Sequence, residues 1–319
     1  MPNAKSKQRS KGFTLVELLV VIGIIGLILG LAIPAVNLAR SASYRVSCAN
    51  NLKQLALAMH TFHGTYSCFP SGRGSGGPPN IPGVGWQAPL LPYLDQESLW
   101  LQTVEANKLQ PLIVPSAIAE DPPRHVVPRD PPHLGMGSVV AATICPADSR
   151  LKTPLNTPKQ NKIAFSSYLG LSQVRAEEFD VPASSYHPGI FGDDHGCRMS
   201  DVLDGTSHTL FFGERPPPAS LQAGPWYSTL LIDFPGGPNQ LLEIPQVPYT
   251  MQDPCGNISK TQALGPGDLQ NPCDRNHFWS LHGGGAHFAT ADGGVRWISY
   301  GNKRLVPAMA TIAGGENLD

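Results

Sequence analysis

The sequence predicts an α+β protein in which one long N-terminal helix precedes and packs on a mostly antiparallel β-sheet domain with Pro- and Gly-rich loop insertions. Three observations support this prediction. An apolar run covers residues 13–36 and continues with helical periodicity, and short apolar segments bounded by turn residues follow it. The 33 glycines and 32 prolines among 319 residues favour many turns. A chain of this length can bury a sizeable core.

Composition excludes several classes of function. The 23 Lys and Arg residues against 24 Asp and Glu residues give a formal charge of −1, so no basic field gathers nucleic acid. Hydrophobic residues at 41% are too frequent for a wholly disordered chain. The chain has no Gly-x-Ser-x-Gly, His-Glu-x-x-His or Walker motif. We therefore expect no enzyme, no catalytic residue, no cofactor and no nucleic-acid partner.

The N-terminus predicts insertion into a lipid bilayer. Residues 1–12 form a basic leader with four cations and no acid, and residues 13–36 are apolar apart from Thr14 and Glu17. As a helix, the apolar segment would reach about 36 Å, enough to cross a hydrocarbon core of about 30 Å. The preceding cations favour a cytoplasmic N-terminus, which predicts a single pass through the cytoplasmic (inner) membrane, with the globular domain in the periplasm or cell exterior. A cleaved secretory signal is the alternative, but its apolar region is normally about 7–15 residues long.

The same helix is expected to continue beyond the membrane. Residues 37–64 carry apolar side chains every three or four positions, which predicts an amphipathic continuation that packs on the globular domain. Pro34 removes one backbone donor and predicts a bend, and Gly64 is expected to end the helix. Glu17 places a carboxylate in the spanning segment at a cost of about 2.5–3.5 kcal/mol. This side chain needs either a partner cation or a position near the membrane edge.

Residues 65–319 are expected to form the exported globular domain. A short helix is predicted over residues 94–108, and an extended Pro-rich insertion over about 111–132. The clearest tertiary signal is a C-terminal hairpin over residues 286–299, because its Asp-Gly pair suits the positive φ angles of a tight turn. Further short strands are predicted over residues 138–145, 163–170 and 208–213.

Residues 11–19, KGFTLVELL, resemble the prepilin processing site of type IV pilins and type II secretion pseudopilins. The resemblance implies cleavage after Gly12 by a prepilin peptidase and N-methylation of Phe13. It also implies that Glu17 neutralises the amine of a neighbouring subunit during assembly and that the helix bends at Pro34. The implied function is that of a structural subunit in or beside a type IV pilus or type II secretion-like filament, with other pilin-like subunits as partners. The alternative is a permanently anchored export-side module that binds a protein or a glycan.

A second resemblance lies at the predicted hairpin. His282 is separated by nine residues from Asp292, which Gly293 follows, and this spacing resembles the His-x9-Asp-Gly signature of a large bacterial family of prepilin-like proteins whose domain function is undetermined. The chain departs from that family at His287, where Asn is common, and in the length of its Pro-rich insertion. Other segments that are similar to the family are Cys48–Leu55, Trp86 with Leu90–Leu94, Cys145-Pro146, Ser167–Gly170, and Asp204–Ser207 leading to Gly213-Glu214.

Six cysteines form an even set in a compartment that permits disulfides, and fifteen complete pairings exist for six. A bond between Cys48 and Cys68 is disfavoured, because the helix climbs about 22 Å to His63 and five residues return only about 17 Å. Cys255 with Cys273 is the local candidate for a disulfide. Two reduced thiols in a loop are the alternative.

Histidine and carboxylate residues raise the question of a metal site. His282, His287 and Asp292, together with residues 193–195 (Asp-Asp-His), offer ligand types that suit several divalent metals. Their spacing is not diagnostic, and Asp292 is already explained by its turn. We therefore predict no metal, and we expect His282 to play a structural role through hydrogen bonds to the adjacent hairpin.

Overall fold

The computed structural model separates the chain into two compact units, Met1–Tyr44 and Arg45–Asp319. The predicted leader and nearly all of the Pro-rich insertion lie outside the residues that the structure describes. The described residues are 14–72, 78–112, 133–156, 162–175, 186–191, 196–219, 224–227, 241–244 and 263–315.

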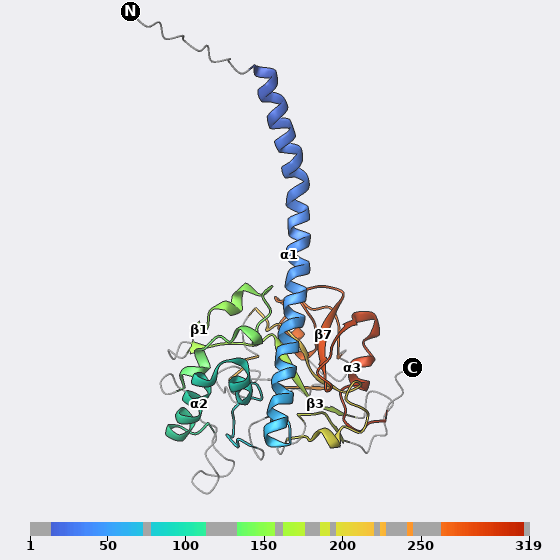
Figure 1. The fold of residues 1–319 in the computed structure, drawn as a ribbon. Coiled ribbons are helices and arrows are strands. Elements are labelled where there is room, and N and C mark those ends of the chain that lie inside the picture. The colour runs from blue at the N-terminus through green and yellow to red at the C-terminus, as the bar shows by residue number, and fades with distance from the viewer. Residues whose placement is uncertain are drawn as a thin grey trace, which may run out of the picture. The chain divides into compact units, whose positions relative to one another are not determined.

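The helix α1, Leu15–Tyr66, runs through both units (Figure 1). Its start is fixed by a capping box, in which the amide and hydroxyl of Thr14 both donate to Glu17 Oε2 at 2.8 Å, and the Glu17 amide donates to the Thr14 hydroxyl. The helix passes Gly64 and ends two residues later than predicted. Ser67, with a φ of 59°, takes the left-handed conformation, and its amide donates to the carbonyl of His63.

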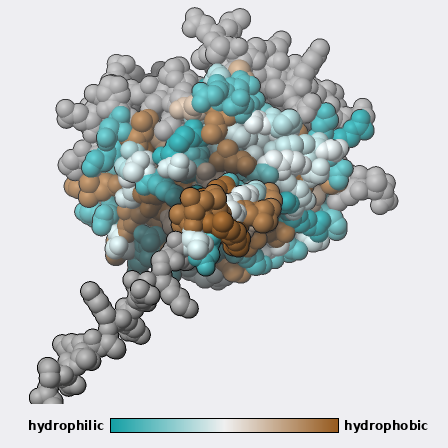
Figure 2. Space-filling view, turned by 90° about the horizontal axis from the view of Figure 1, so that it is seen from above, coloured by the Kyte–Doolittle hydropathy of each residue, from teal (hydrophilic) through white to brown (hydrophobic). Residues whose placement is uncertain are grey.

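In the first unit, α1 exposes apolar side chains all round. Leucine, isoleucine and valine residues from Leu15 to Leu38 are exposed, and they form a brown surface in Figure 2. Among the described residues, α1 is the one helix that is long and apolar enough to cross a membrane. Pro34 lies inside this segment. The length and composition of this part of α1 suit a single-pass membrane anchor.

In the second unit, one face of α1 is buried against the domain. Burial begins at Cys48 rather than at the start of the predicted amphipathic segment, since Leu38 is 73% and Val46 60% exposed. The buried face then follows the expected spacing of three or four residues through Leu52, Leu55 and other side chains to Phe62. The part of the helix that packs on the domain is therefore shorter than the apolar pattern predicts.

A six-stranded sheet forms the centre of the domain, with strand order β4-β3-β5-β7-β8 and with β6 paired to β3. All these pairings are antiparallel except the parallel pair of β3 and β6, which confirms the predicted fold class. A separate two-stranded sheet joins β1 and β2. The strands are β1 Leu155–Asn156, β2 Lys162–Ile163, β3 Tyr168–Arg175, β4 Tyr186–Pro188, β5 Leu210–Glu214, β6 Leu241–Ile244, β7 Gly285–Thr290 and β8 Val295–Ser299.

The predicted hairpin and the second helix are both present. β7 and β8 pair antiparallel from Gly285↔Ser299 to Ala289↔Val295, and α2 covers Glu97–Leu109. A short helix, α3, covers Leu305–Ala308. The prediction of a strand over residues 138–145 is wrong, because this segment turns through a 3-10 helix at Ala141–Thr143, where the amide of Thr143 bonds back to the carbonyl of Val140.

The main core lies between α1 and the sheet. It joins the buried face of the helix to Tyr168 of β3, Phe211 and Phe212 of β5, and Ala289 of β7. Trp86 fills the space between these elements and stacks on Phe212 with ring centroids 4.9 Å apart. Figure 1 shows this part of α1 beside β3 and β7. The core therefore fixes the position of the helix at the point where Cys48 meets the domain.

A second hydrophobic cluster packs against α2, and Tyr227 of this cluster contacts the buried side chain of His133. His133 Nε2 lies 2.8 Å from the carbonyl oxygen of Gln110, and its Nδ1 lies 2.8 Å from the hydroxyl of Tyr227. A carbonyl can only accept, so Nε2 carries the proton, and Nδ1 accepts from the tyrosine in the neutral ring. Burial lowers the pKa of His133, although the bond to Gln110 partly opposes this effect.

Candidate functional site

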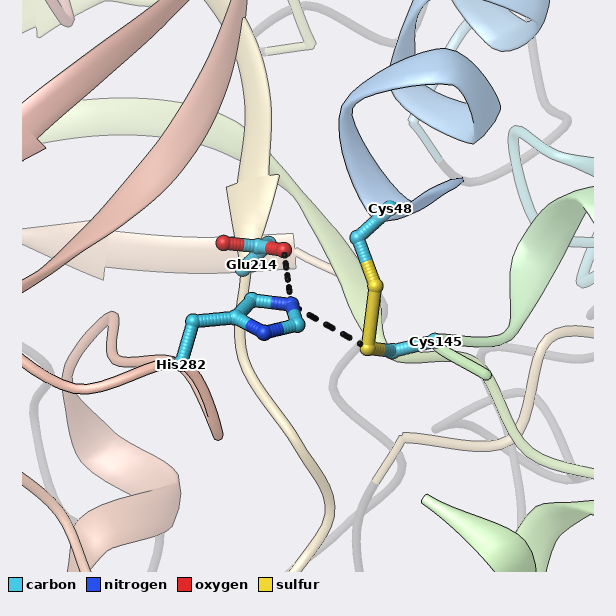
Figure 3. Close-up of side chains that lie close together, drawn as sticks. All are labelled: Cys48, Cys145, Glu214 and His282. Carbon is cyan, nitrogen blue, oxygen red and sulfur yellow. Dashed lines mark hydrogen bonds and ion pairs between the residues drawn. A yellow bond between two sulfur atoms is a disulfide. The ribbon is translucent and has the colours of Figure 1, made fainter. Parts of the chain in front are cut away.

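Four segments that the sequence analysis singled out meet at one buried point. Cys48 comes from α1, Cys145 from the loop after the Ala141–Thr143 turn, Glu214 from the end of β5, and His282 from the segment before β7 (Figure 3). One potential ligand atom from each side chain lies within 4.8 Å of the other three. These residues are separated by up to 234 positions in the chain, so the fold alone brings them together.

A disulfide joins Cys48 to Cys145, with Cα atoms 5.3 Å apart and a sequence separation of 97. This bond ties α1 covalently to the domain, and it agrees with the expectation that Cys48 does not pair with Cys68. Cys68 and Cys197 retain their thiols. Cys273 is disulfide-bonded, but Cys255 lies outside the described residues. The predicted pairing of Cys255 with Cys273 therefore stays a prediction.

Glu214 is almost completely buried at the end of β5, and one of its oxygens is held by His287. The His287 amide donates to Glu214 Oε2 at 2.7 Å, and the ring Nδ1 lies 3.1 Å from the same oxygen. Burial alone would raise the pKa of Glu214, but hydrogen bonds from His282 and His287 and the charge of His287 outweigh it and lower the pKa. His287, the residue at which the chain departs from the family that it resembles, is thus the partner of the Glu214 carboxylate.

The ring of His282 lies between Glu214 and the disulfide (Figure 3). Its Nε2 is 3.5 Å from Glu214 Oε1 and 3.5 Å from Cys145 Sγ, and the side chain is 3% exposed. Within the described residues, the His282 ring makes no direct hydrogen bond to the hairpin, contrary to the expectation. Instead the hydroxyl of Ser280 accepts from the His282 amide and donates to the carbonyl of Gly285, the first residue of β7.

The turn of the hairpin has the structure that its sequence predicts. Asp292 Oδ1 accepts from the hydroxyl of Thr290 at 2.6 Å and from the amide of Gly294 at 2.9 Å, and Gly293 has a φ of 81°. Asp292 therefore lies in the turn and not in the cluster with His282. The predicted signature thus separates into two places, with its histidine in the cluster and its Asp-Gly pair at the tip of the hairpin.

Three further contacts bind α1 to this region. Lys53 Nζ donates to the carbonyl of Gly293 at 2.6 Å, and Asn51 Nδ2 donates to the carbonyl of Ile144 at 2.8 Å. The guanidinium of Arg45 lies 3.7 Å from the ring centroid of Trp297 on β8. Apart from the resemblance of residues 48–55 to the family, no sequence pattern predicted these contacts. Together with the disulfide, these contacts fix the helix to the hairpin and to the loop at Cys145.

The predicted processing and assembly residues belong to the other unit. Gly12 and Phe13 lie outside the described residues, as do residues 193–195 of the weighed metal set. Glu17 caps the start of α1 with Thr14, and Pro34 lies within the helix.

A spanning helix that begins just after a processing motif defines a prepilin-like membrane protein. Comparison with known families agrees with this class, because residues 7–33 match the prokaryotic N-terminal methylation motif. Residues 38–304, more than half of the chain, match the family described as protein of unknown function (DUF1559), and the chain belongs to that family. The searches of curated proteins and of solved structures found no match.

Proposed function

We propose that the chain is a structural subunit that is cleaved after Gly12, N-methylated at Phe13, and assembled in or with a type IV pilus or type II secretion-like filament. The observation that carries this proposal is the methylation motif over residues 7–33, which covers most of the apolar part of α1. The basic leader favours a cytoplasmic N-terminus, so we place the domain on the export side of the membrane.

The start of α1 supports a role for Glu17 in assembly. Both hydrogen bonds from Thr14 use the same carboxylate oxygen, Oε2. In our proposal, Oε1 accepts the methylated amine of Phe13 from a neighbouring subunit, which removes the cost of an unpaired charge in lipid. The prepilin peptidase, the bilayer and other pilin-like subunits are therefore the proposed partners.

The first test is mass spectrometry of the mature N-terminus from native membranes. We expect a methylated Phe13 at the start of the chain. A Gly12→Glu variant should keep its leader, because the cleavage site is changed while α1 is not. A mature chain that still carries residues 1–12 would contradict the proposed processing.

The second test separates the charge of Glu17 from its capping role. Glu17→Gln keeps a side chain that can complete the capping box but loses the negative charge, whereas Glu17→Ala loses both. When expressed at the wild-type level, both variants should be processed and inserted into the membrane. We expect neither variant in the assembled particles that are sheared from cells. Assembly of Glu17→Gln at the wild-type level would exclude a role for the charge. Processed wild-type chains that never leave the membrane would instead support an anchored export-side binding module.

A further inference from the structure

Although the sequence alone predicts no metal, we propose that Cys48, Cys145, Glu214 and His282 bind one zinc ion when the Cys48–Cys145 disulfide is reduced. Two thiolates, one imidazole and one carboxylate are a ligand set that suits tetrahedral zinc. The four side chains are buried or nearly so, and they come from four separate segments. This proposal concerns the exported domain and does not depend on filament assembly.

The distances already present fit such a site. With zinc–ligand bonds of about 2.0–2.3 Å, neighbouring ligand atoms of a tetrahedral site lie about 3.3–3.8 Å apart. His282 Nε2 is 3.5 Å from both Cys145 Sγ and Glu214 Oε1, so two edges of the tetrahedron are in place. The main change that zinc requires is the separation of the two sulfur atoms, which reduction permits.

The groups around the cluster orient its ligands. His287 holds Glu214 Oε2 through its amide and its ring, so that Oε1 is the oxygen that faces His282. Glu214 Oε1 is buried, and its contact with His282 Nε2 is 3.5 Å long, beyond an ordinary hydrogen bond. A buried carboxylate oxygen without a close hydrogen-bond donor is uncommon, and a metal ion would supply a close partner. The bonds from His287 to Glu214 are the kind of support that ligating carboxylates have in metal sites. Ser280 fixes the backbone of His282.

The chemical steps balance with a dithiol as the reductant. The dithiol gives two electrons and two protons to the disulfide, which becomes two thiols, and the dithiol itself is oxidised to a disulfide. Zinc then displaces the two thiol protons into solvent and is bound by two thiolates, by Glu214 Oε1 and by the unprotonated Nε2 of His282. A newly made chain also carries thiols, so zinc can bind before the disulfide forms. In either state the same two cysteines hold α1 to the domain.

The test compares the reduced and oxidised forms of the full chain in detergent. Each form is incubated with zinc, desalted and analysed for metal by mass spectrometry. We expect one zinc ion per reduced chain and none per oxidised chain, and we expect zinc to raise the melting temperature of the reduced form only. Equal zinc content in the two wild-type forms would overturn the proposal without the use of any variant.

Variants assign the ligands. His282→Ala and Glu214→Gln should each weaken zinc binding at least tenfold in the reduced chain, whereas a double Cys68→Ser/Cys197→Ser control should bind as the wild type does. Cobalt in place of zinc should give the intense visible bands of a tetrahedral site and a sulfur-to-cobalt charge-transfer band. Loss of metal in the control, or retention in the Cys48→Ser variant, would place the metal elsewhere and refute the assignment.

Discussion

Removal of the Cys48–Cys145 disulfide should destabilise the domain by an amount that its loop predicts. The bond closes a loop with a sequence separation of 97. In the chain-entropy model, a loop of this length contributes about 4.7 kcal/mol, and removal of native disulfides typically costs about 2–5 kcal/mol. We therefore expect Cys48→Ala to lower the free energy of unfolding by about 2–5 kcal/mol and the melting temperature by about 5–15 °C.

Tryptophan fluorescence can measure this loss in the full chain in detergent, because all five tryptophans lie in the domain and Trp86 and Trp226 are fully buried. The measurement should be made under oxidising conditions without zinc. Cys145→Ala should show a similar loss, and the double variant should lose little more than either single variant, since each change removes the same bond. Fully additive losses, or a loss below about 0.5 kcal/mol in the single variants, would refute the reasoning.

Three further predictions concern the hairpin and the second core cluster. Lys53→Met should lower the free energy of unfolding by about 1–2 kcal/mol, because it removes a charge-assisted hydrogen bond to the hairpin turn, and chemical denaturation would detect this. Gly293→Ala should cost about 1–2 kcal/mol in the same assay because its φ is 81°, whereas Gly301→Ala should be nearly neutral; equal losses would contradict the argument. Burial lowers the pKa of His133 in the folded state, so the unfolded chain binds the proton more readily. The stability from this group is complete above about pH 6.5 and is lost as the pH falls toward the lowered folded pKa. Between pH 7.5 and about pH 5, urea titrations should therefore show a smaller loss of unfolding free energy in His133→Gln than in the wild type. The same pH dependence of stability in both proteins would exclude His133 as the source of the loss.

Local signals predicted the parts of the fold that depend on neighbouring residues. The apolar run and its helical continuation predicted α1 to within three residues at either end, and Asp292-Gly293 predicted the hairpin of β7 and β8. The end of α1 was missed at Gly64 because a glycine inside a helix costs only about 1 kcal/mol, which packing of the preceding turns outweighs. Such a loss is too small to fix a boundary from the sequence.

The buried cluster could not be predicted in the same way. Its members share no local pattern, and the spacing of His282, His287 and Asp292 was not diagnostic of a site. The strand pairings instead place Glu214 beside His287, while Asp292 lies at the turn. Cys48 pairs with Cys145 in only three of the fifteen complete pairings open to six cysteines. The burial of only part of the α1 face also depends on where the domain ends, which periodicity does not encode.

The bond between Cys48 and Cys145 has a topological consequence for the segment that it encloses. Residues 49–144, which include the whole Pro-rich insertion, lie within a covalent ring that Cys48 and Cys145 close; the N-terminal part of α1 joins the ring at Cys48, and the rest of the domain joins it at Cys145. A single proteolytic nick anywhere in this ring would leave both fragments attached, so the cut chain would migrate as two bands only on a reducing gel. Insertions and deletions in this stretch can likewise change the size of the ring without breaking the bond that holds α1 to the globular domain.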